Sequence, residues 1–452
     1  MMTLTILPGH SLSGVISLPG DKSLSHRAAL FASLAAGRSQ IENFLVSGVT
    51  TRLLEALTSL GIFWKLDGTT LTVEGRGLGG YSIPFAPINC GNSASTLRFL
   101  SGALAASGTP AVLDGSKGLR RRPMDRIIVP LQQMGVNVKG TAGCAPLSMG
   151  VSHLPLKGGI INTPVSSAQV KTCLLLAGLS AGEPVTIIEP GFSRDHTERM
   201  LAGMGVTINS EKTSANGSAQ YQTHLIPPAT RYSLKPLTMS LPGDFSSAAF
   251  LIVAAVITPG SEITLQNIGL NATRTGLLDV LLSMGASIQI AARPSRNGEP
   301  VGDLTIRHCP LKGVDISGEQ VVRMIDEFPI FAIAAAFASG TSTVRDASEL
   351  RLKESDRISG LCAELKAIGV SVDETVDGFS IHGKGAIQGG TVDPHGDHRL
   401  AMSLAVAGLA SQQPITVLNS EIMQESFPEF TDVITRLGGA LEDTPNLEPS
   451  HA

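Results

Sequence analysis

The sequence is poor in aromatic residues, in charge and in long apolar runs, and each shortage excludes a class of protein. Aromatic residues make up 4% of the 452 positions, so the core must be packed mainly by Ala, Leu, Ile and Val. Charged residues make up only 16%, against 42% hydrophobic residues, which argues against a disordered chain. The net charge of -4 gives no indication of a broad basic surface for nucleic acid, so an anionic ligand must meet a local cluster of cations.

Membrane segments and disulfides are not expected either. The longest apolar runs, 248–257 and 330–338, are far shorter than the ~20 residues that cross a bilayer. Residues 1–10 lack the basic and apolar regions of a signal peptide. The five cysteines show no CxxC spacing, which is more typical of reduced thiols than of a disulfide framework. We therefore expect a cytoplasmic protein with no membrane or nucleic-acid partner.

Glycine, in contrast, is abundant, and its spacing reveals an internal repeat. In four places a polar or small residue that suits a helix N-cap is followed 16 residues later by a glycine that suits a C-cap. These pairs are Asp21 and Gly37, Asn92 and Gly108, Ser166 and Gly182, and Asp244 and Gly260, with looser copies at Asp326 to Gly340 and Asp397 to about Gln413. The enclosed segments are apolar on nearly all faces, which predicts helices inside a domain.

A second, more amphipathic helix is predicted in every repeat, after a short β-rich segment such as 111–114 or 185–189. Each of these helices ends at a bulky apolar residue followed by glycine. The six pairs are Leu60-Gly61, Met134-Gly135, Met204-Gly205, Met284-Gly285, Ile368-Gly369 and Leu437-Gly438. The chain is therefore predicted to hold six β-α-β-α-β-β units.

One pentapeptide divides the six units into two groups. Ser-Leu-Pro-Gly-Asp occurs unchanged at 17–21 and at 240–244. A Pro-Gly turn at both places suits two chain crossings at one hinge. We therefore predict an α/β fold with two pseudo-threefold domains, each of three units, joined by a double hinge. One domain spans 21–241, and the other consists of 1–20 and 242–452.

Positively charged segments lie at the openings of the predicted buried helices. They are 21–27, 91–98 with 120–123, 166–171 with 194–199, and 326–327 with 350–357 and 397–399. Lys and Arg in the first turns of a helix oppose its dipole, so a bound anion explains them better than ordinary capping does. The alternatives are a solvated role for at least one of the arginines at 120–122 and a surface ladder of ion pairs at 350–357.

Metal and nucleotide sites are not predicted. His395, Asp397 and His398 lie close in sequence, but no third soft ligand with suitable spacing accompanies them. The sequence contains no GxGxxG, P-loop or HExxH motif. We therefore expect a protein without metal or cofactor.

Taken together, these segments resemble the 5-enolpyruvylshikimate-3-phosphate synthase family. The motifs that carry the resemblance are GDKSxSHR, GNSxSTxR, RRPM, SSAQVK, RDHTE, LRLKESDR and GDHRLAM, and the likeness runs from 18–27 to 426–430. It implies an enolpyruvyl transferase-like fold whose two domains close over the substrates. It also implies transfer of the enolpyruvyl group of phosphoenolpyruvate to the 5-hydroxyl of shikimate 3-phosphate, with release of inorganic phosphate, in aromatic amino-acid biosynthesis.

The resemblance further implies which residues contact the substrates. For shikimate 3-phosphate they are Lys22, Ser23, Arg27, Ser167, Ala168, Gln169, Arg194, Asp326 and Lys353. For phosphoenolpyruvate they are Lys22, Asn92, Ala94, Arg122, Gln169, Arg357 and Arg399. The residues implied to carry the proton transfers are Lys22, Asp326 and Glu354. Glu354 would protonate the methylene carbon and later take the proton back, while Asp326 or Lys22 would deprotonate the attacking hydroxyl.

Two positions depart from the family pattern. Ala94 stands where herbicide-sensitive members have Gly, which makes the chain similar to the glyphosate-tolerant class. Glu425 stands where many members have Lys, so the cation at that position is missing from the predicted site.

Two other functions compete with this interpretation. An enolpyruvyl transferase that acts on UDP-N-acetylglucosamine has the same fold, but that family usually carries a reactive cysteine in the loop matching 114–123, where this chain has none. A non-catalytic binding protein built from repeats is the second alternative. Such a protein would not need acidic and basic residues at the same end of several repeats. We expect a monomer whose partners are the two small-molecule substrates.

Overall fold

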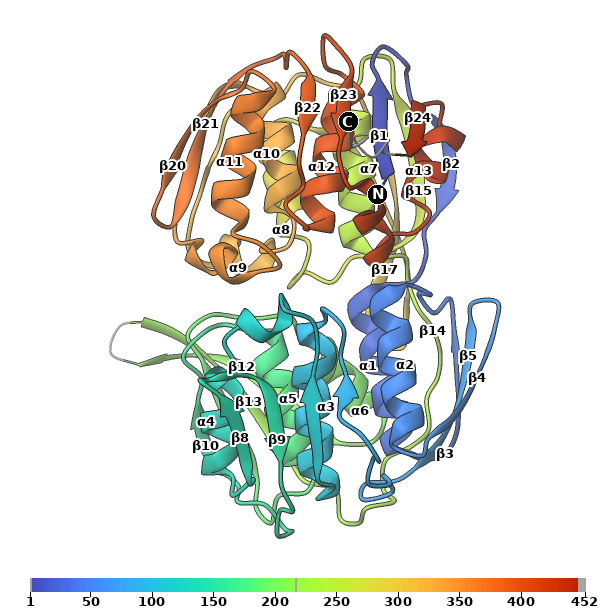
Figure 1. Cartoon of the computed structure of the whole chain (residues 1–452), viewed down its shortest axis with the longest axis vertical. Coiled ribbons are helices and arrows are strands. Elements are labelled where there is room, and N and C mark those ends of the chain that lie inside the picture. Colours follow the sequence, from blue (N-terminus) through green and yellow to red (C-terminus); the bar gives the residue numbers. More distant parts are fainter. Residues whose placement is uncertain (1, 216–217, 446–452) are drawn as a thin grey trace, which may run out of the picture. The chain divides into compact units, whose positions relative to one another are not determined.

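The computed structural model describes residues 2–215 and 218–445, which form two compact units (Figure 1). The N-unit consists of Gly20–Pro242 and Ser295–Glu299. The C-unit consists of the residues up to Pro19, of Gly243–Pro294, and of the chain from Pro300 onward. The segment 295–299 was predicted to lie in the other domain. It is the tip of a hairpin and bonds to the N-unit, where Arg199 donates to the Gly298 carbonyl oxygen at 2.8 Å.

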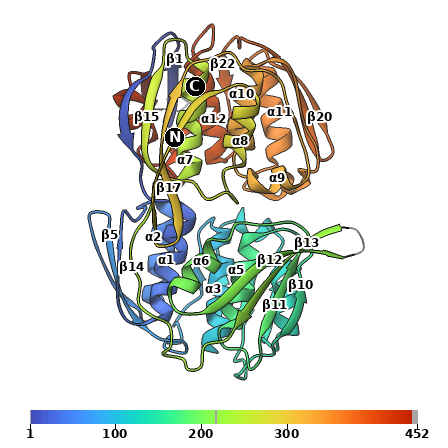
Figure 2. The same ribbon diagram turned by 180° about the vertical axis from the view of Figure 1, so that it is seen from behind.

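Each unit contains three four-stranded sheets, and in every sheet one edge strand is parallel to its neighbour. In the N-unit the first sheet has the order β14 (Thr238–Ser240), β3 (Ala36–Glu42), β5 (Thr70–Arg76) and β4 (Phe63–Asp67). The second has the order β6 (Ile88–Asn89), β7 (Ala111–Asp114), β9 (Cys144–Met149) and β8 (Val138–Thr141). The third has the order β10 (Gly159–Asn162), β11 (Val185–Glu189), β13 (Ser218–Ile226) and β12 (Thr207–Ala215), in which β12 and β13 form a long hairpin (Figure 2).

The C-unit repeats this pattern. Its first sheet has the order β16 (Ser287–Arg296), β17 (Glu299–Arg307), β15 (Glu262–Gly269) and β2 (Ser13–Ser17). The second has the order β18 (Asp315–Ile316), β19 (Ser339–Val344), β21 (Gly378–Lys384) and β20 (Ser371–Thr375). The third has the order β22 (Gly390–Val392), β23 (Ile415–Val417), β1 (Met2–Leu7) and β24 (Ala440–Pro445). The predicted sixfold repeat is confirmed.

Two helices accompany each sheet, with a few short helices beside them. The helices of the N-unit are α1 (Lys22–Leu34), α2 (Gly48–Ser59), η1 (Leu119–Arg121), α3 (Ala94–Ser107), α4 (Asp125–Gln133), α5 (Ala168–Gly178) and α6 (His196–Gly203). Those of the C-unit are α7 (Phe245–Ile257), α8 (Gly276–Ser283), α9 (Glu319–Arg323), α10 (Phe328–Phe337), η2 (Ser348–Leu352), α11 (Arg357–Ala367), α12 (His398–Gly408), η3 (Ser420–Glu425) and α13 (Phe430–Arg436). Among the described residues, none of these helices has the length and hydropathy needed to span a bilayer.

The chain passes from one unit to the other at each copy of the pentapeptide. Strand β2 directly precedes α1 in the chain but pairs with β15 of the C-unit. Strand β14 directly precedes α7 but pairs with β3 of the N-unit. The two copies of the pentapeptide therefore occupy equivalent places in the fold, where Asp21 and Asp244 both act as N-caps.

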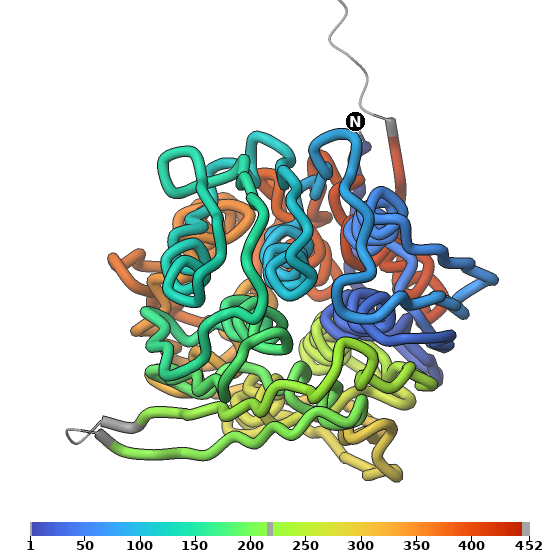
Figure 3. The backbone as a smooth tube through the Cα atoms, turned by 90° about the horizontal axis from the view of Figure 1, so that it is seen from below, coloured from blue at the N-terminus to red at the C-terminus, as the bar shows by residue number. Residues whose placement is uncertain are grey.

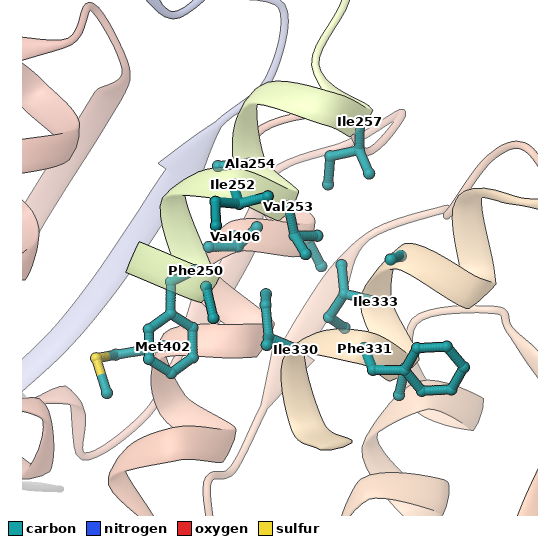
Figure 4. Close-up of a cluster of buried hydrophobic side chains, with 14 of the residues drawn as sticks. Phe250, Ile252, Val253, Ala254, Ile257, Ile330, Phe331, Ile333, Met402 and Val406 are labelled. Atoms are coloured by element: carbon teal, nitrogen blue, oxygen red, sulfur yellow. The ribbon is translucent and has the colours of Figure 1, made fainter. Parts of the chain in front are cut away.

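The first helix of every repeat is buried on all sides, as its composition predicts. Every residue of α7 is buried, and Figure 4 shows its apolar side chains lying against those of α10 and α12. Helices α1, α3 and α5 hold the same place in the N-unit, and α1 and α3 are seen end-on in Figure 3. Because small and branched side chains fill both cores, three helices can pack closely without many aromatic rings.

The prediction that glycines end the helices is confirmed for the amphipathic helices but only in part for the buried ones. The glycine after each amphipathic helix has a φ between 79° and 105°, a backbone conformation that favours glycine, so all six of these ends are confirmed. Among the four glycines predicted to end buried helices, Gly108 is a left-handed C-cap of α3. Gly37 instead lies inside β3, because α1 ends early at Leu34 and an extended Ala35 leads into the strand.

Candidate active site

The first group of candidate site residues lies where three buried helices of the N-unit begin. Asp21, Ser93 and Ser167 are the N-caps of α1, α3 and α5, and each side chain accepts a hydrogen bond from a backbone N–H of the first turn. The predicted caps Asn92 and Ser166 are each one residue too early. Since the N-terminal end of a helix carries partial positive charge, three such ends in one unit favour an anion.

Side chains join the three helices into a ring. His26 of α1 bonds to Thr96 of α3 at 3.3 Å, and burial lowers the pKa of this histidine to about 4. Gln169 of α5 bonds to α3 twice, donating to Ser95 Oγ at 2.8 Å and accepting from Arg98 Nη1 at 2.5 Å. The ring therefore fixes the predicted ligand Gln169 on both of its amide atoms.

Arg27 closes the ring between α1 and α5. Its guanidinium donates to Thr197 Oγ1 at 2.8 Å and to Thr172 Oγ1 at 3.0 Å, and it lies 4.8 Å from the centre of the Phe99 ring. Only 3% of Arg27 is exposed, whereas Lys22 and Ser23 are half-buried in the first turn of α1. Lys22 and Ser23 are therefore more accessible to a ligand than Arg27 is.

The three consecutive arginines play different parts. Arg120 and Arg121 are exposed, and Arg120 forms an ion pair with Asp114 at 2.5 Å. Arg122 is 8% exposed. The expectation that at least one arginine of this run is solvated is confirmed, and the buried one is the predicted phosphoenolpyruvate ligand.

Ala94 and Asn92 lie at the start of α3. Ala94 is the first residue of the helix and is 2% exposed, so its methyl group occupies space inside the unit. Asn92 accepts a hydrogen bond from Ser116 Oγ at 2.9 Å, which ties it to the loop that leads to Arg122. Ala168 and Arg194, the remaining N-unit ligands predicted, are partly exposed at the start of α5 and in the loop before α6.

The second group of candidate site residues lies in the C-unit around the buried Arg357. Its Nε donates to Asp397 Oδ2 at 2.7 Å and its Nη2 donates to Glu354 Oε2 at 2.7 Å. A third carboxylate, Asp326, lies 3.7 Å from Nη1. Burial opposes the charge of Arg357, but the attraction of Asp397 and Glu354 outweighs it and raises the pKa of Arg357 above its usual value.

Asp326 lies among three cations. Its oxygens are 3.7 Å from Lys353 Nζ, 3.7 Å from Arg357 Nη1 and 3.8 Å from Arg399 Nη2. Burial lowers the pKa of Lys353, and this outweighs the opposing effect of Asp326. The structure thus brings together all five residues that the sequence predicts in this unit.

Asp397 is the residue that orders this cluster. It is fully buried, caps α12 by accepting from the backbone N–H of Arg399 at 2.8 Å, and binds Arg357 from α11. Burial by itself raises the pKa of Asp397, but the attraction of the neighbouring cations, mainly Arg357, outweighs this effect. The net shift of the pKa is therefore downward. Helices α11 and α12 are therefore held together by a charged pair at their N-terminal ends.

The surface-ladder alternative describes Arg351 but not Arg357. Arg351 pairs with Asp356 and Glu374, both at 2.8 Å, and these side chains are 25–40% exposed. Only 2% of the Arg357 side chain is exposed. The charge motif 350–357 therefore serves two purposes, one on the surface and one inside the unit.

Two of the three residues considered for a metal, His395 and Asp397, have different partners. His395 Nε2 lies 2.9 Å from Glu364 Oε1, while Asp397 binds Arg357. Within the part of the chain that the structure describes, no group of three or more His, Cys, Asp or Glu side chains is arranged to hold a metal ion.

Several contacts around these candidate residues were not predicted. In the C-unit, Ser246 donates to Glu327, and Arg274 donates to Ser246 Oγ at 3.0 Å and to Asp244 Oδ1 at 2.7 Å. Glu327 also lies 3.8 Å from Arg399. In the N-unit, Arg98 was missed as a partner of Gln169, although it lies inside the motif 91–98. Such partners are 28 to 81 residues apart, so local spacing carries no signal for them.

Comparisons with known proteins identify the family and the fold. The family model described as EPSP synthase (3-phosphoshikimate 1-carboxyvinyltransferase) matches residues 6–434. The chain is 43% identical to a 3-phosphoshikimate 1-carboxyvinyltransferase of Geobacter sulfurreducens over 97% of this chain and 99% of the relative. It is 44% identical to one of Roseiflexus sp. over 97% and 99% of the two chains. The solved structure of an EPSP synthase from Acinetobacter baumannii is similar with a TM-score of 0.84 and 37% identity, covering 98% of this chain and all of that one (100%).

Proposed function

The chain belongs to the EPSP synthase (3-phosphoshikimate 1-carboxyvinyltransferase) family, and on this basis we propose which of its residues carry out the reaction. The enzyme moves the enolpyruvyl group of phosphoenolpyruvate onto shikimate 3-phosphate and releases inorganic phosphate. The acceptor UDP-N-acetylglucosamine is not favoured, because the relatives that match nearly the full length are 3-phosphoshikimate enzymes.

The N-unit holds the phosphate of shikimate 3-phosphate in this proposal. The supporting observation is the meeting of three helix N-termini with cations, and with hydroxyl and amide side chains that suit a hydroxylated phosphate ester. Lys22, Ser23, Ser167 and Arg194 contact the substrate. Arg27 also orients α5 and α6, because its guanidinium donates hydrogen bonds to Thr172 and Thr197.

The C-unit supplies the acid–base chemistry. The observation that carries this assignment is the cluster around Arg357, in which partly exposed carboxylates stand beside buried cations. Asp326 and Glu354 each expose 21% of their side chains, whereas Arg357 and Arg399 expose 2% and 6%. The carboxylates can therefore reach a substrate, while the arginines provide a fixed positive field for its phosphate and carboxylate.

The reaction proceeds by addition and elimination. Glu354 gives a proton to the methylene carbon of phosphoenolpyruvate while the 5-hydroxyl of shikimate 3-phosphate attacks the neighbouring carbon. Asp326 or Lys22 takes the proton of that hydroxyl. The tetrahedral intermediate then expels phosphate as Glu354 removes a proton from the new methyl group, which restores the double bond and the acid. Arginine side chains stabilise the departing phosphate, so no step requires a metal.

Phosphate release tests this function directly. We expect inorganic phosphate to appear only when the enzyme is given both phosphoenolpyruvate and shikimate 3-phosphate. Omitting either substrate is the control. Release with UDP-N-acetylglucosamine in place of shikimate 3-phosphate would contradict the assigned acceptor, and no release from a folded protein with both substrates would contradict the assigned reaction.

Ala94 is proposed to weaken inhibition by glyphosate. Its buried methyl group at the start of α3 shortens the space beside the phosphoenolpyruvate site, which affects the longer inhibitor more than the smaller substrate. We expect Ala94→Gly to lower the inhibition constant of glyphosate about tenfold or more, with a much smaller change in the KM of phosphoenolpyruvate. Inhibition of phosphate release measures both constants.

A second alanine of the same helix provides the control. Ala105 is also buried in α3 but lies 11 residues further along, roughly 16 Å from Ala94. Ala105→Gly should leave glyphosate inhibition unchanged, although both substitutions weaken the helix. An unchanged inhibition constant in Ala94→Gly, or an equal change in both variants, would disprove the steric explanation.

A further inference from the structure

A buried charge cluster in the N-unit, formed by Lys171, Glu189 and Glu198, lies next to residues proposed to contact shikimate 3-phosphate. Lys171 of α5 has its Nζ 2.9 Å from Glu189 Oε2 and 2.7 Å from Glu198 Oε1. The side chains of Lys171 and Glu189 are 1% exposed and that of Glu198 is 8% exposed. Lys171 Nζ also donates to the Ser193 carbonyl oxygen at 3.3 Å and lies 5.4 Å from the centre of the Phe192 ring.

Glu189 connects this cluster to two places where the substrate is proposed to bind. Its Oε1 accepts from the backbone N–H of Ser167 at 3.2 Å, at the start of α5. The same oxygen accepts from Ser193 Oγ at 2.7 Å, next to Arg194. One carboxylate oxygen therefore holds both Ser167 and the loop that carries Arg194, while Lys171 holds the other oxygen.

Glu198 has a different place in the cluster. Besides Lys171, its Oε1 lies 3.5 Å from Thr223 Oγ1, on strand β13 of the third sheet. Among the described residues, the bonds from the Ser167 N–H and from Ser193 Oγ go to Glu189 and not to Glu198. Burial raises the pKa of Glu198 even though Lys171 opposes this shift. The two glutamates are thus comparable in burial and in their distance to Lys171, but only Glu189 reaches the proposed ligands.

The cost of burying ions makes a positioning role the better explanation. Removing charged groups from water is expensive, and buried ion pairs often contribute little to stability compared with apolar residues of the same size. A charged hydrogen bond is, however, directional and holds its partners in a fixed geometry. The three charged groups of this cluster therefore suit the orientation of neighbouring groups better than they suit core packing.

We propose that Lys171 and Glu189 are positioning residues of the shikimate 3-phosphate site, which hold Ser167 and the loop before Arg194 in the geometry that binds the substrate. This inference rests on the substrate contacts proposed above for Ser167 and Arg194. Lys171 orients the Glu189 carboxylate, and Glu189 orients the two substrate contacts. Neither residue touches the reacting atoms.

Exchanging each glutamate for glutamine tests the proposal. In Glu189→Gln, one amide oxygen must accept from Ser167 and Ser193 while the NH2 group faces the ammonium of Lys171, so the geometry is disturbed. We expect the Kd of shikimate 3-phosphate, measured by isothermal titration calorimetry on the whole protein, to rise about tenfold or more. The KM of this substrate should rise in parallel, while kcat at saturation stays within about threefold.

The matched variant is Glu198→Gln, in which Lys171 can still bind Glu189. We expect its Kd for shikimate 3-phosphate to stay within about twofold of the wild-type value. Ser193→Ala serves as a milder second variant, because it removes one bond to Glu189 without unbalancing the charges. It should raise the Kd a few fold. Lys171→Met should weaken binding as Glu189→Gln does, and Lys171→Arg should recover part of the loss because it keeps the charge.

The possible results separate the positioning role from the proposed site. Equal losses of affinity in Glu189→Gln and Glu198→Gln would indicate a general effect on stability and would overturn the proposal. Unchanged affinity in Ser193→Ala together with a parallel fall of kcat and affinity in Glu189→Gln would overturn it as well. Failure of the wild-type protein to bind shikimate 3-phosphate would instead contradict the proposed site itself.

Discussion

Glu354→Gln is expected to bind both substrates and to lose turnover by about 10²- to 10⁴-fold, the contribution typical of a general acid–base group. The amide oxygen of glutamine can still accept the hydrogen bond from Arg357 Nη2, which is 2.7 Å long in the wild-type protein. The cluster should therefore stay intact while the group that carries the proton is lost. Phosphate release measures kcat, and calorimetric titration measures the binding of each substrate.

Glu374 offers a matched control for this experiment. It also accepts from an arginine of the same charge motif, Arg351, at 2.8 Å, but it belongs to β20 and 35% of its side chain is exposed. Glu374→Gln should keep its turnover within about twofold of the wild type. Normal turnover in Glu354→Gln would remove Glu354 from the proton transfers, and loss of substrate binding in that variant would show that its main task is to orient Arg357.

The repeats could be predicted from the sequence because they depend on local chemistry. A glycine after Leu60 or Met284 adopts a backbone conformation that favours glycine, and this requirement is visible in one chain without any tertiary contact. Buried helices such as α7 are equally visible, since a segment that is apolar on all sides must lie inside a domain. The division into two groups of repeats is also visible locally, because the same pentapeptide occurs at 17–21 and at 240–244.

The C-unit group of candidate site residues was predictable because its cations and carboxylates are concentrated in short motifs. Arg357 and Glu354 are only three residues apart in the sequence, so a contact between them could be expected from their spacing. That Arg357 is buried, and that it binds Asp397, does not follow from spacing, since α11 and α12 are brought together only by the packing of the C-unit core. The resemblance to the family supplied the substrate roles, which spacing alone does not give.

The contacts that hold the predicted ligands in place could not be predicted, for a physical reason. Gln169 bonds to Arg98 across 71 residues, and Glu189 bonds to Ser167 across 22. Both contacts depend on how β-strands and helices from different repeats pack, and a lone Glu at the end of a strand looks the same whether it faces solvent or a buried lysine. The tip of the β16–β17 hairpin was assigned to the wrong unit for the same reason.

Arg357→Gln is expected to give the largest loss of stability among substitutions in the cluster. Removing the guanidinium leaves Asp397, which is fully buried, and the partly buried Glu354 without their main cation. Breaking a buried ion pair on one side typically costs about 3–5 kcal/mol of unfolding free energy, because the remaining charge is not compensated. Urea denaturation followed by circular dichroism measures this loss, and phosphate release should fall as well.

A double variant separates the two consequences of losing Arg357. In Arg357→Gln with Asp397→Asn, the uncompensated buried charge is gone, so part of the stability should return. Turnover should not return, because the cation proposed to bind phosphoenolpyruvate is still missing. Arg307→Gln is the control for the loss of an exposed pair, since Arg307 and Glu262 expose 43% and 56% of their side chains and such pairs contribute about 0–1 kcal/mol. If the double variant recovered turnover together with stability, Arg357 would be a structural residue that stabilises α11 and α12, and the phosphoenolpyruvate site would have to be built from the remaining cations.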